Sequence, residues 1–513
     1  MKLVTAQQMR ELDRAAIERH GVPSLELMER AGQGVAHAVQ KRVESQKGTV
    51  VVVVGRGNNG GDGLVCARHL ISAGYQVSVL LLASPNLLSP DARANWELLA
   101  PLTAHLLAIE SVGELNSHRP TLATASCIVD AVLGTGLDRE VGGLAAAAIE
   151  AINSSGVPVI AVDIPSGLSA DTGLPLGQAV TAMATITFGL PKQGLFIGQG
   201  PSCAGQVEVV DIGIPQEEVE KVESALSVID PSMFVHRLPK RRADAHKGTF
   251  GHVVVFAGSR GHLGAGYLAC LAALRAGCGV VTYCIPEKAF VRFDARYPEV
   301  MCDPIPDAGT ANFHPLGLDE ALDIARGKSA VAIGPAIGTS QSTREFVNRL
   351  VKRIDVPLVI DADGLNVLDL ASVRGRRSLT ILTPHPGEMS KLMGTTSAAV
   401  QADRLGFASK LAAASGAIVV LKGQGTVVAT PDGRASINLT GNAGMATAGM
   451  GDALTGMVAS FLAQGMDSRN ASAAAVYIHG LAGDMAAAEH TERALITSDV
   501  IRCLGRAIKE IER

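Results

Sequence analysis

A polar, glycine-rich run follows an apolar stretch at residues 50–54. It includes Asn58-Asn59-Gly60-Gly61-Asp62, and the glycines at 55, 57 and 60 have the spacing of a dinucleotide-binding loop. Tight glycine turns let backbone N–H groups and a helix N-terminus face a phosphate. A dehydrogenase would also need an acidic residue after the next strand to bind a ribose, and residues 81–84 contain none. The run therefore favours a phosphate-containing ligand and weakens a hydride-transfer function, with a plain β–α turn as the alternative.

Two further aspartates, Asp130 and Asp163, follow apolar segments and precede glycine-containing loops. Ligands of open α/β sheets bind outside the carboxyl ends of the strands, so we expect Asp62, Asp130 and Asp163 at one crevice. A single strand-end aspartate is more often a helix cap or a turn former. Three of them in separate loops favour a binding or catalytic site.

The C-terminal half contains a second set of glycine-rich loops. One is Lys422-Gly423-Gln424-Gly425-Thr426, and the other, residues 449–452, places Gly449, Gly451 and Asp452 directly before an apolar helical stretch. Glycine N–H groups at a helix start can form an anion hole for a transferring phosphoryl group. An aspartate at that place can accept the proton of an attacking hydroxyl. A turn with an N-capping aspartate is the alternative, but the lysine loop upstream favours phosphoryl transfer.

The elements that would position these loops alternate as in a parallel α/β sheet. Helical spacing over residues 5–44, broken at 21–23, precedes strand-like segments at 49–54, 75–82, 127–133, 157–163 and 184–188. A second series lies at 252–256, 280–285, 330–333, 358–361, 380–383 and 417–422. The sequence thus predicts two tandem α/β domains: a Rossmann-like, doubly wound domain at 1–215, a charged linker at 216–245 and a second domain at 246–513.

The composition places the chain among globular proteins. Its 513 residues are 47% apolar and 18% charged, which excludes disorder, and the net charge of −4 argues against a nucleic-acid partner. No apolar run approaches the ~18 residues of a membrane helix, and the polar N-terminus lacks a signal core. We therefore expect a cytoplasmic protein without a membrane partner. Its eight scattered cysteines are expected to be reduced, mostly buried thiols.

Four motifs of the first half resemble the NAD(P)H-hydrate epimerase family. They are Asn58-Asn-Gly-Gly-Asp62, Val129-Asp-Ala-Val-Leu-Gly-Thr-Gly136, Asp163-Ile-Pro-Ser-Gly167 and Phe188-Gly-Leu-Pro-Lys192. The resemblance implies exchange of the R and S hydrates of NADH and NADPH, and a potassium ion at Asn59, Asp130 and Ser166. It implies hydrate binding by Asp163 and by two loops, made of Asn58, Asn59, Gly60, Gly61, Asp62, Gly134, Thr135, Gly136, Leu137, Asp138, Arg139 and Glu140.

Inversion at the hydroxyl-bearing carbon of the hydrated ring needs a carboxylate that can move a proton. Asp163 is our candidate, because it follows a strand and matches the ligand-contacting aspartate of the family. Lys192 is a second candidate, and a solvated loop lysine is its alternative.

Motifs of the second half resemble the NAD(P)H-hydrate dehydratases, which implies a ribokinase-like α/β fold. They include Gly334-Pro-Ala-Ile-Gly338, Asp361-Ala-Asp-Gly-Leu-Asn366 and Thr383-Pro-His-Pro-Gly-Glu388. The resemblance implies hydrate contacts at Ala265, Gly338, His385 and Asp452, and a nucleotide at residues 422–426 and Gly451. Kinases of the superfamily commonly have asparagine where His385 stands. Glu388 could anchor magnesium or be an exposed acid at a helix start. Three residues, Ala336, Ile337 and Met450, depart from the family pattern.

The combined hypothesis is a bifunctional repair enzyme. Its second domain would use ADP or ATP with Mg²⁺ to phosphorylate the hydroxyl of the S hydrate, so that phosphate can leave, with Asp452 accepting the hydroxyl proton. ADP is favoured because fused family members generally use it. The alternative is a small-molecule kinase with an N-terminal ligand-binding or scaffold domain. Apolar helices such as residues 471–488 would allow a homo-oligomer.

Overall fold

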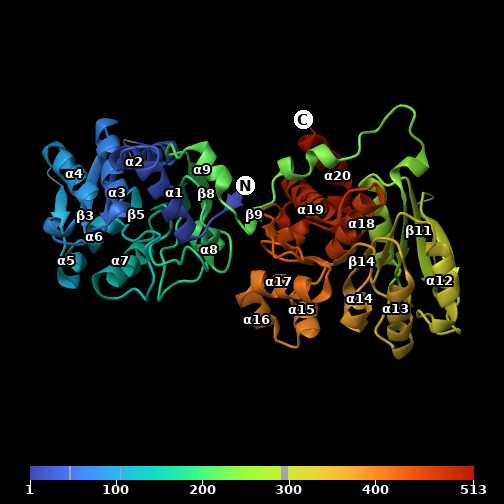
Figure 1. The fold of residues 1–513 in the computed structure, drawn as a ribbon. Coiled ribbons are helices and arrows are strands. Elements are labelled where there is room, and N and C mark those ends of the chain that lie inside the picture. The colour runs from blue at the N-terminus through green and yellow to red at the C-terminus, as the bar shows by residue number, and fades with distance from the viewer. Residues whose placement is uncertain (45–47, 104, 291–298, 513) are drawn as a thin grey trace. The chain divides into compact units, whose positions relative to one another are not determined.

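The computed structural model divides the chain into two units, shown in Figure 1. The N-terminal unit is Lys2–Leu226, and the C-terminal unit is Ser227–Arg513 together with Met1. The structure describes residues 1–44, 48–103, 105–290 and 299–512. Each unit is an α/β fold around a mainly parallel sheet, which confirms the predicted fold class.

The N-terminal unit has a parallel sheet of order β4-β3-β2-β5-β6-β7-β8. Its strands are β2 (Thr49–Val54), β3 (Gln76–Leu81), β4 (Leu106–Ala108), β5 (Cys127–Ala131), β6 (Val159–Val162), β7 (Ala184–Phe188) and β8 (Gln206–Val210). The chain proceeds from β2 toward one edge and from β5 toward the other, so the strand order reverses between them. Such a reversal opens a crevice outside the carboxyl ends of the strands.

Helices cover both faces of this sheet because β2 is apolar at successive positions. Val50, Val52 and Val54 belong to an apolar cluster with α1, α2 and α3, whereas Val51 and Val53 belong to one with α5 and α7. The helices are α1 (Ala6–Glu18), α2 (Ser24–Arg42), α3 (Asn58–Ser72), α4 (Pro90–Leu99), α5 (Val112–Ser117), α6 (Arg119–Ala123), α7 (Gly143–Ser154), α8 (Gly200–Ala204) and α9 (Gln216–Lys221). The predicted helical pair with a break at 21–23 is confirmed as α1 and α2.

The N-terminal unit begins with the short strand β1 (Lys2–Leu3), and α9 lies near its end. The short strand β9 (Leu226–Val228) begins at the last residue of this unit and ends in the C-terminal unit. Within the segment predicted as a linker, α9 places Glu218 against the end of α1, where Arg19 Nη1 lies 3.2 Å from Glu218 Oε2.

The C-terminal unit contains strands in the order β18-β17-β16-β15-β14-β13-β10-β11-β12. Pairing is parallel from β16 to β12 and antiparallel in the β16-β17-β18 meander. The strands are β10 (His252–Phe256), β11 (Val280–Pro286), β12 (Met301–Ile305), β13 (Ala330–Ile333), β14 (Leu358–Ile360), β15 (Thr380–Leu382), β16 (Ile418–Leu421), β17 (Val427–Ala429) and β18 (Ala435–Ile437). The six strand segments predicted in this half are all present.

Helix α18 (Met450–Ala463) is buried along nearly its whole length and packs against α10 (Gly264–Arg275). The approach is close because Gly456 has no side chain at the contact. The other helices are α11 (Glu287–Phe290), α12 (Leu318–Ala325), α13 (Gln341–Arg353), α14 (Ala362–Val367), α15 (Pro386–Met393), α16 (Ser397–Ala402), α17 (Arg404–Ser415), α19 (Ser468–His490) and α20 (Thr497–Ile511).

All eight cysteines are free, and each except Cys302 is buried, which confirms the expectation of reduced thiols. Among the described residues, no helix is both long and apolar enough to cross a membrane.

The close contact between α10 and α18 predicts that a single added methyl group strongly lowers the stability of this unit. A Cβ at Gly456 would lie 1.9 Å from the Ala269 carbonyl oxygen. We therefore expect Gly456→Ala to lower the free energy of unfolding of the C-terminal unit by about 1–3 kcal/mol, measured by urea denaturation of the full chain.

Gly505→Ala is the matched control, because Gly505 lies inside α20 and a Cβ there would meet no atom within 4 Å. It should raise the same free energy by about 0.5–1 kcal/mol through better helix propensity. Equal stability of the two variants would contradict the packing argument.

Candidate functional site

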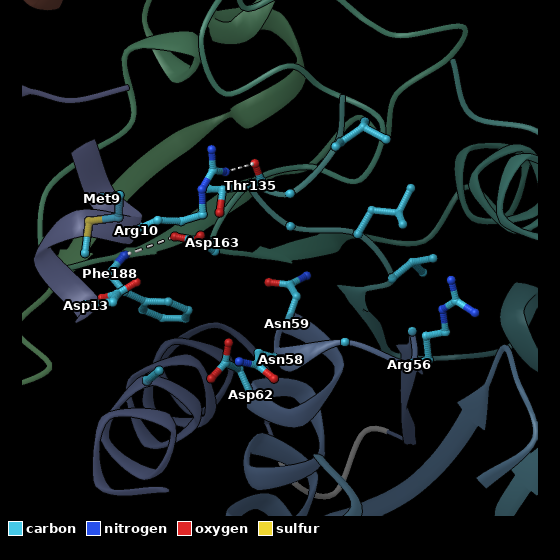
Figure 2. Close-up of a pocket in the computed structure, with 18 of the residues that line it drawn as sticks. Met9, Arg10, Asp13, Arg56, Asn58, Asn59, Asp62, Thr135, Asp163 and Phe188 are labelled. Carbon is cyan, nitrogen blue, oxygen red and sulfur yellow. Dashed lines mark hydrogen bonds between the residues drawn. The ribbon is translucent and has the colours of Figure 1, made fainter. Parts of the chain in front are cut away.

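A cavity of about 820 Å³ opens at the carboxyl ends of β2, β5 and β6, where the strand order of the N-terminal unit reverses (Figure 2). The loops that follow these strands form its walls, and α1 and α3 contribute further side chains. The predicted residues that line it are Asn58, Asn59, Asp62, Gly134, Thr135, Gly136, Leu137, Asp138, Arg139, Glu140 and Asp163.

Gly60 and Gly61 are buried within the first turn of α3, away from the lining of this cavity. A Cβ at Gly60 would lie 1.9 Å from the Gly55 carbonyl oxygen, and one at Gly61 would lie 2.6 Å from the Met28 side chain. In this structure both glycines allow α3 to begin in close contact with its neighbours.

Asp163 is held by several donors on one carboxylate oxygen. Its Oδ1 accepts hydrogen bonds from Lys192 Nζ at 2.5 Å, Thr187 Oγ1 at 3.0 Å and the Phe188 N–H at 3.3 Å. Its backbone has φ +64°, an unfavourable conformation for a non-glycine residue. Lys192 is only 1% exposed, so its alternative interpretation as a solvated loop lysine is wrong.

Two more carboxyls, Asp13 of α1 and Asp62 of α3, face the same cavity (Figure 2). Burial raises the pKa of Asp13 to about 6 and that of Asp62 well above its usual range. Nearby Asp163 contributes to both increases, and Lys192 opposes them. In the described part of the chain, neither carboxyl forms a side-chain hydrogen bond or ion pair.

Sequence reasoning missed Asp13. The available signal was an acidic residue one turn after Met9 on the apolar face of α1, which is unexpected for a helix that packs against a core. The same helix contacts the loop after β5, because Arg10 Nη1 donates to the Thr135 carbonyl at 3.4 Å.

Asp130 and Ser166 are joined by hydrogen bonds, and Asn59, in the first turn of α3, lies beside the loop that follows Asp130. Ser166 Oγ donates to Asp130 Oδ1 at 2.6 Å, and the Ser166 N–H donates to Asp130 Oδ2 at 2.8 Å. The Leu133 N–H donates to Ser166 Oγ at 2.8 Å, and the next residue, Gly134, packs beside Asn59. Burial raises the pKa of Asp130 to about 6, and hydrogen bonds from Ser166 partly oppose this. The Asn59 Nδ2 group is buried without a hydrogen-bond partner.

The second candidate site lies at the carboxyl ends of β14, β15 and β16, beside the start of α18. Asp361 Oδ1 accepts from Lys422 Nζ at 2.5 Å, and its Oδ2 accepts from Thr455 Oγ1 at 2.7 Å. Asp361 is 1% exposed, so this pair is removed from bulk water. Burial lowers the pKa of Lys422, but Asp361 and Glu388 more than compensate and raise it.

Asp452 and Glu388 share this environment. Burial, together with nearby Asp361, raises the pKa of each to about 7, while Lys422 opposes the increase. Glu388 is 5% exposed, so its interpretation as an exposed acid is wrong. Gly449 begins α18 with φ +92°, and a Cβ at Gly451 would lie 3.1 Å from Lys422 Nζ.

His385 caps the start of α15. Its Nδ1 accepts from the N–H groups of Gly387 at 3.0 Å and Glu388 at 3.3 Å, and Glu388 Oε2 accepts from the His385 N–H at 2.8 Å. Burial and nearby Lys422 lower the pKa of His385. The imidazole is therefore neutral, and its Nε2 carries the proton because Nδ1 is an acceptor.

Two further predicted residues are Gly338, which lies in the loop after β13, and Ala265, which lies in a helix. Gly338 donates its N–H to Asp363 Oδ2 at 3.0 Å, and Ala265 lies in the first turn of α10. Next to that turn is a cavity of about 520 Å³ whose lining includes Arg260 and Lys288.

The structure shows the local environment of two residues that depart from the family pattern. Ala336 adopts φ +54°, a backbone conformation that glycine would adopt more easily. Met450 is 6% exposed and belongs to the apolar core.

The loop Gly423–Gln424–Gly425–Thr426 has left-handed backbone at Gly423 and Gly425, and Thr426 Oγ1 donates to the Gly423 carbonyl at 2.8 Å. Sequence reasoning missed Arg404, whose Nη2 donates to the carbonyls of Leu421 and Lys422 at 3.0 and 3.1 Å. This arginine fixes the end of β16 and thereby the base of the lysine loop.

Comparisons with known proteins match both halves of the chain. A family described as YjeF-related protein N-terminus matches residues 24–194, and one described as NAD(P)H-hydrate dehydratase matches residues 253–505. A protein of Moorella thermoacetica named bifunctional NAD(P)H-hydrate repair enzyme Nnr is 41% identical, over 100% of this chain and 97% of its own length. A protein of the same name from Thermofilum pendens is 39% identical, over 100% of this chain and 97% of its own length.

A solved structure also resembles the chain. It is the ADP/ATP-dependent NAD(P)H-hydrate dehydratase of Bacillus subtilis, crystallised with ATP and Mg²⁺, at 31% identity and a TM-score of 0.49. The match covers 56% of this chain and 99% of that one.

Burial of Asp361 predicts that Lys422 is needed for stability. In Lys422→Met the carboxylate would remain buried with Thr455 as its hydrogen-bond donor but without a cation. We expect the free energy of unfolding to fall by about 3–5 kcal/mol, measured by urea denaturation.

Lys391→Met provides the control, because the Lys391 ammonium is exposed and donates to Asn366 Oδ1 at the surface. Its effect should stay below about 1 kcal/mol. A Lys422 variant as stable as the Lys391 variant would contradict a buried ion pair.

Proposed function

The chain belongs to the family of bifunctional NAD(P)H-hydrate repair enzymes, and we propose that residues 1–215 perform the epimerisation and residues 246–513 the dehydration, joined by residues 216–245. The enzyme acts on the hydrates of NADH and NADPH: the first activity exchanges R and S, and the second returns the S hydrate to NAD(P)H. The observation that supports two activities is the presence of two separate clusters of carboxyls and a lysine, each at the carboxyl ends of its own sheet.

For the epimerisation, Asp163 is the proposed catalytic carboxylate. Lys192, Thr187 and the Phe188 N–H all donate to its Oδ1, which stabilises the ionised form. Its Oδ2 is then available to accept a proton from water or from the hydroxyl of the hydrate. Asn58, Asn59, Asp62 and the loop 134–140 would surround the hydrated dinucleotide, because all of them line the cavity, while Gly60 and Gly61 would shape the loop.

The residues proposed for potassium, Asn59, Asp130 and Ser166, fit a hard cation. They offer carboxylate, hydroxyl and amide oxygens, and the buried Asp130 has no cationic partner in the described residues. Turning the Asn59 amide would direct its oxygen to a cation and relieve the unpartnered Nδ2. Bound potassium would supply positive charge beside the loops that hold the hydrate.

For the dehydration, Asp452 is the proposed base. It would accept the proton of the ring hydroxyl while that oxygen attacks the terminal phosphorus of ADP or ATP, delivered with Mg²⁺. The N–H groups at Gly449 and Gly451 would stabilise the transferring phosphoryl group, and residues 422–426 would bind the nucleotide. Phosphate then departs as the ring-nitrogen lone pair forms a carbon–nitrogen double bond, which is easier than expelling hydroxide. Loss of a proton from the neighbouring ring carbon to water would then give the carbon–carbon double bond of NAD(P)H.

Neutral His385, Ala265 and Gly338 are the proposed hydrate contacts in the second unit, and Glu388 is the proposed anchor for Mg²⁺. We further propose ADP as the usual donor and a cytoplasmic location. The apolar side chains of α19 are buried in the core of their own unit, so this helix does not support self-association. The small-molecule kinase alternative is not favoured, because both halves match hydrate-repair families over the full length.

The bound-cation proposal predicts a potassium-dependent stability. Replacing KCl with choline chloride at equal ionic strength should lower the unfolding temperature of the N-terminal unit, because a ligand that binds the folded state stabilises it. Asp130→Asn should remove this difference, whereas Asp211→Asn, which changes an exposed carboxylate, should preserve it. An unchanged potassium effect in Asp130→Asn would contradict the site.

The proposed function is tested by recovery of reduced-nicotinamide absorbance from a mixed R/S hydrate of NADH with ADP, with ATP or with neither. We expect nucleotide-dependent recovery of both forms, corrected for spontaneous epimerisation. Asp452→Asn should abolish recovery yet bind nucleotide, and the rate should fall below about pH 7 because the base must be ionised.

In the same assay, Asp163→Asn should restore reduced-nicotinamide absorbance from the S hydrate at the wild-type rate. It should not restore absorbance from the R hydrate beyond spontaneous epimerisation. Full activity of Asp452→Asn would contradict the dehydratase assignment. Recovery of the S fraction alone by the wild-type protein would make the N-terminal unit a binding module.

A further inference from the structure

Of the charged groups that line the cavity of the N-terminal unit, three carboxyls and one ammonium group act on one another. The carboxyls, labelled in Figure 2, belong to Asp13, Asp62 and Asp163, and the ammonium belongs to Lys192. One buried cation can balance one buried carboxylate, and each further ionised carboxyl would have to be desolvated beside a like charge. The cluster therefore disfavours simultaneous ionisation of all three carboxyls.

The hydrogen bonds decide which carboxyl is ionised. The Asp163 carboxylate accepts hydrogen bonds from Lys192 Nζ at 2.5 Å, Thr187 Oγ1 at 3.0 Å and the Phe188 N–H at 3.3 Å. The lysine ammonium therefore directly neutralises its negative charge. Asp62 receives no such donor among the described residues, and its carboxyl is open to the cavity. The Asp62 carboxyl accepts no hydrogen bond among the described residues and lies near two other carboxyls, so it retains its proton.

We propose that Asp62 is a second catalytic residue of the epimerisation, acting in its neutral form as the proton donor opposite Asp163. The inference rests on the proposed function of this unit. Asp62 extends from the second turn of α3, while Asp163 follows β6, and Figure 2 shows both carboxyls directed into one space from these different elements. A flat ring between them would have an acid toward one face and a base toward the other.

The reaction balances with these two groups and water. The proton of Asp62 passes to the ring hydroxyl as its carbon–oxygen bond breaks, water leaves, and the ring-nitrogen lone pair forms a carbon–nitrogen double bond. Water then adds to the other face of that carbon and gives its proton to Asp163, while the electron pair of the double bond returns to nitrogen. The net change is inversion of the carbon and transfer of one proton from Asp62 to Asp163. The reverse inversion uses the same groups with their roles exchanged.

The test follows conversion of the R hydrate of NADH to the S hydrate by chromatography, with the full chain and without nucleotide, so that dehydration does not interfere. Asp62→Asn should invert at least about 100-fold more slowly than the wild type, the usual size of an acid–base contribution. Glu11→Gln is the matched control, since this carboxylate lies on the exposed side of α1 and accepts only from Gln7 Nε2.

Two further measurements separate chemistry from misfolding. Formate should restore inversion to Asp62→Ala, because a small acid can replace the missing proton donor, and a misfolded protein would not respond. In isotopically labelled water, the wild type should introduce one solvent oxygen at the inverted carbon for each inversion.

If Asp62→Asn inverts the R hydrate at a rate within about threefold of the wild-type rate, the inference is overturned, because loss of a proton donor should have a larger effect. Failure of formate to restore Asp62→Ala, or inversion that retains the original oxygen, would also overturn it. A wild-type chain that does not invert the R hydrate would instead overturn the proposed function itself.

Discussion

A buried aspartate at a strand end, paired with a lysine, organises each unit. Lys192 Nζ lies 2.5 Å from Asp163 Oδ1, and Lys422 Nζ lies 2.5 Å from Asp361 Oδ1. Burying two opposite charges is favourable only with good geometry and additional hydrogen bonds, which threonine hydroxyls supply in both units. Because the partners of each pair follow different strands, the pair fixes the relative position of the loops that complete the site.

The shortage of positive charge also determines the protonation of the neighbouring acids. In the N-terminal unit, burial and repulsion raise the pKa of Asp13 to about 6 and that of Asp62 well above its usual range, which favours the protonated form of Asp62. In the C-terminal unit, the pKa of Asp452 rises to about 7, so the same carboxyl can accept and release a proton near neutrality. One physical rule therefore accounts for the proposed acid of one unit and the proposed base of the other.

The sequence predicted the fold well where a pattern was local. The consecutive valines at 50–54 indicate a strand buried on both faces, and the motifs after each strand identify the loops that meet at the cavity. Asp13 and Arg404 could not be identified in this way, because their contribution depends on packing between segments distant in sequence. For Lys192 the pattern left two interpretations open, since burial is a property of the folded chain.

The burial of the cysteines has a consequence for the reactivity of the protein under oxidising conditions. Attack on peroxides and electrophiles requires a thiolate, and burial raises the pKa of thiols such as Cys127 and Cys278 to about 12. Even half-buried Cys302 has its pKa raised to about 11. Among the described residues, neither candidate site uses a thiol. An enzyme that restores damaged reductants can thus remain active while the surrounding thiol pool is being consumed.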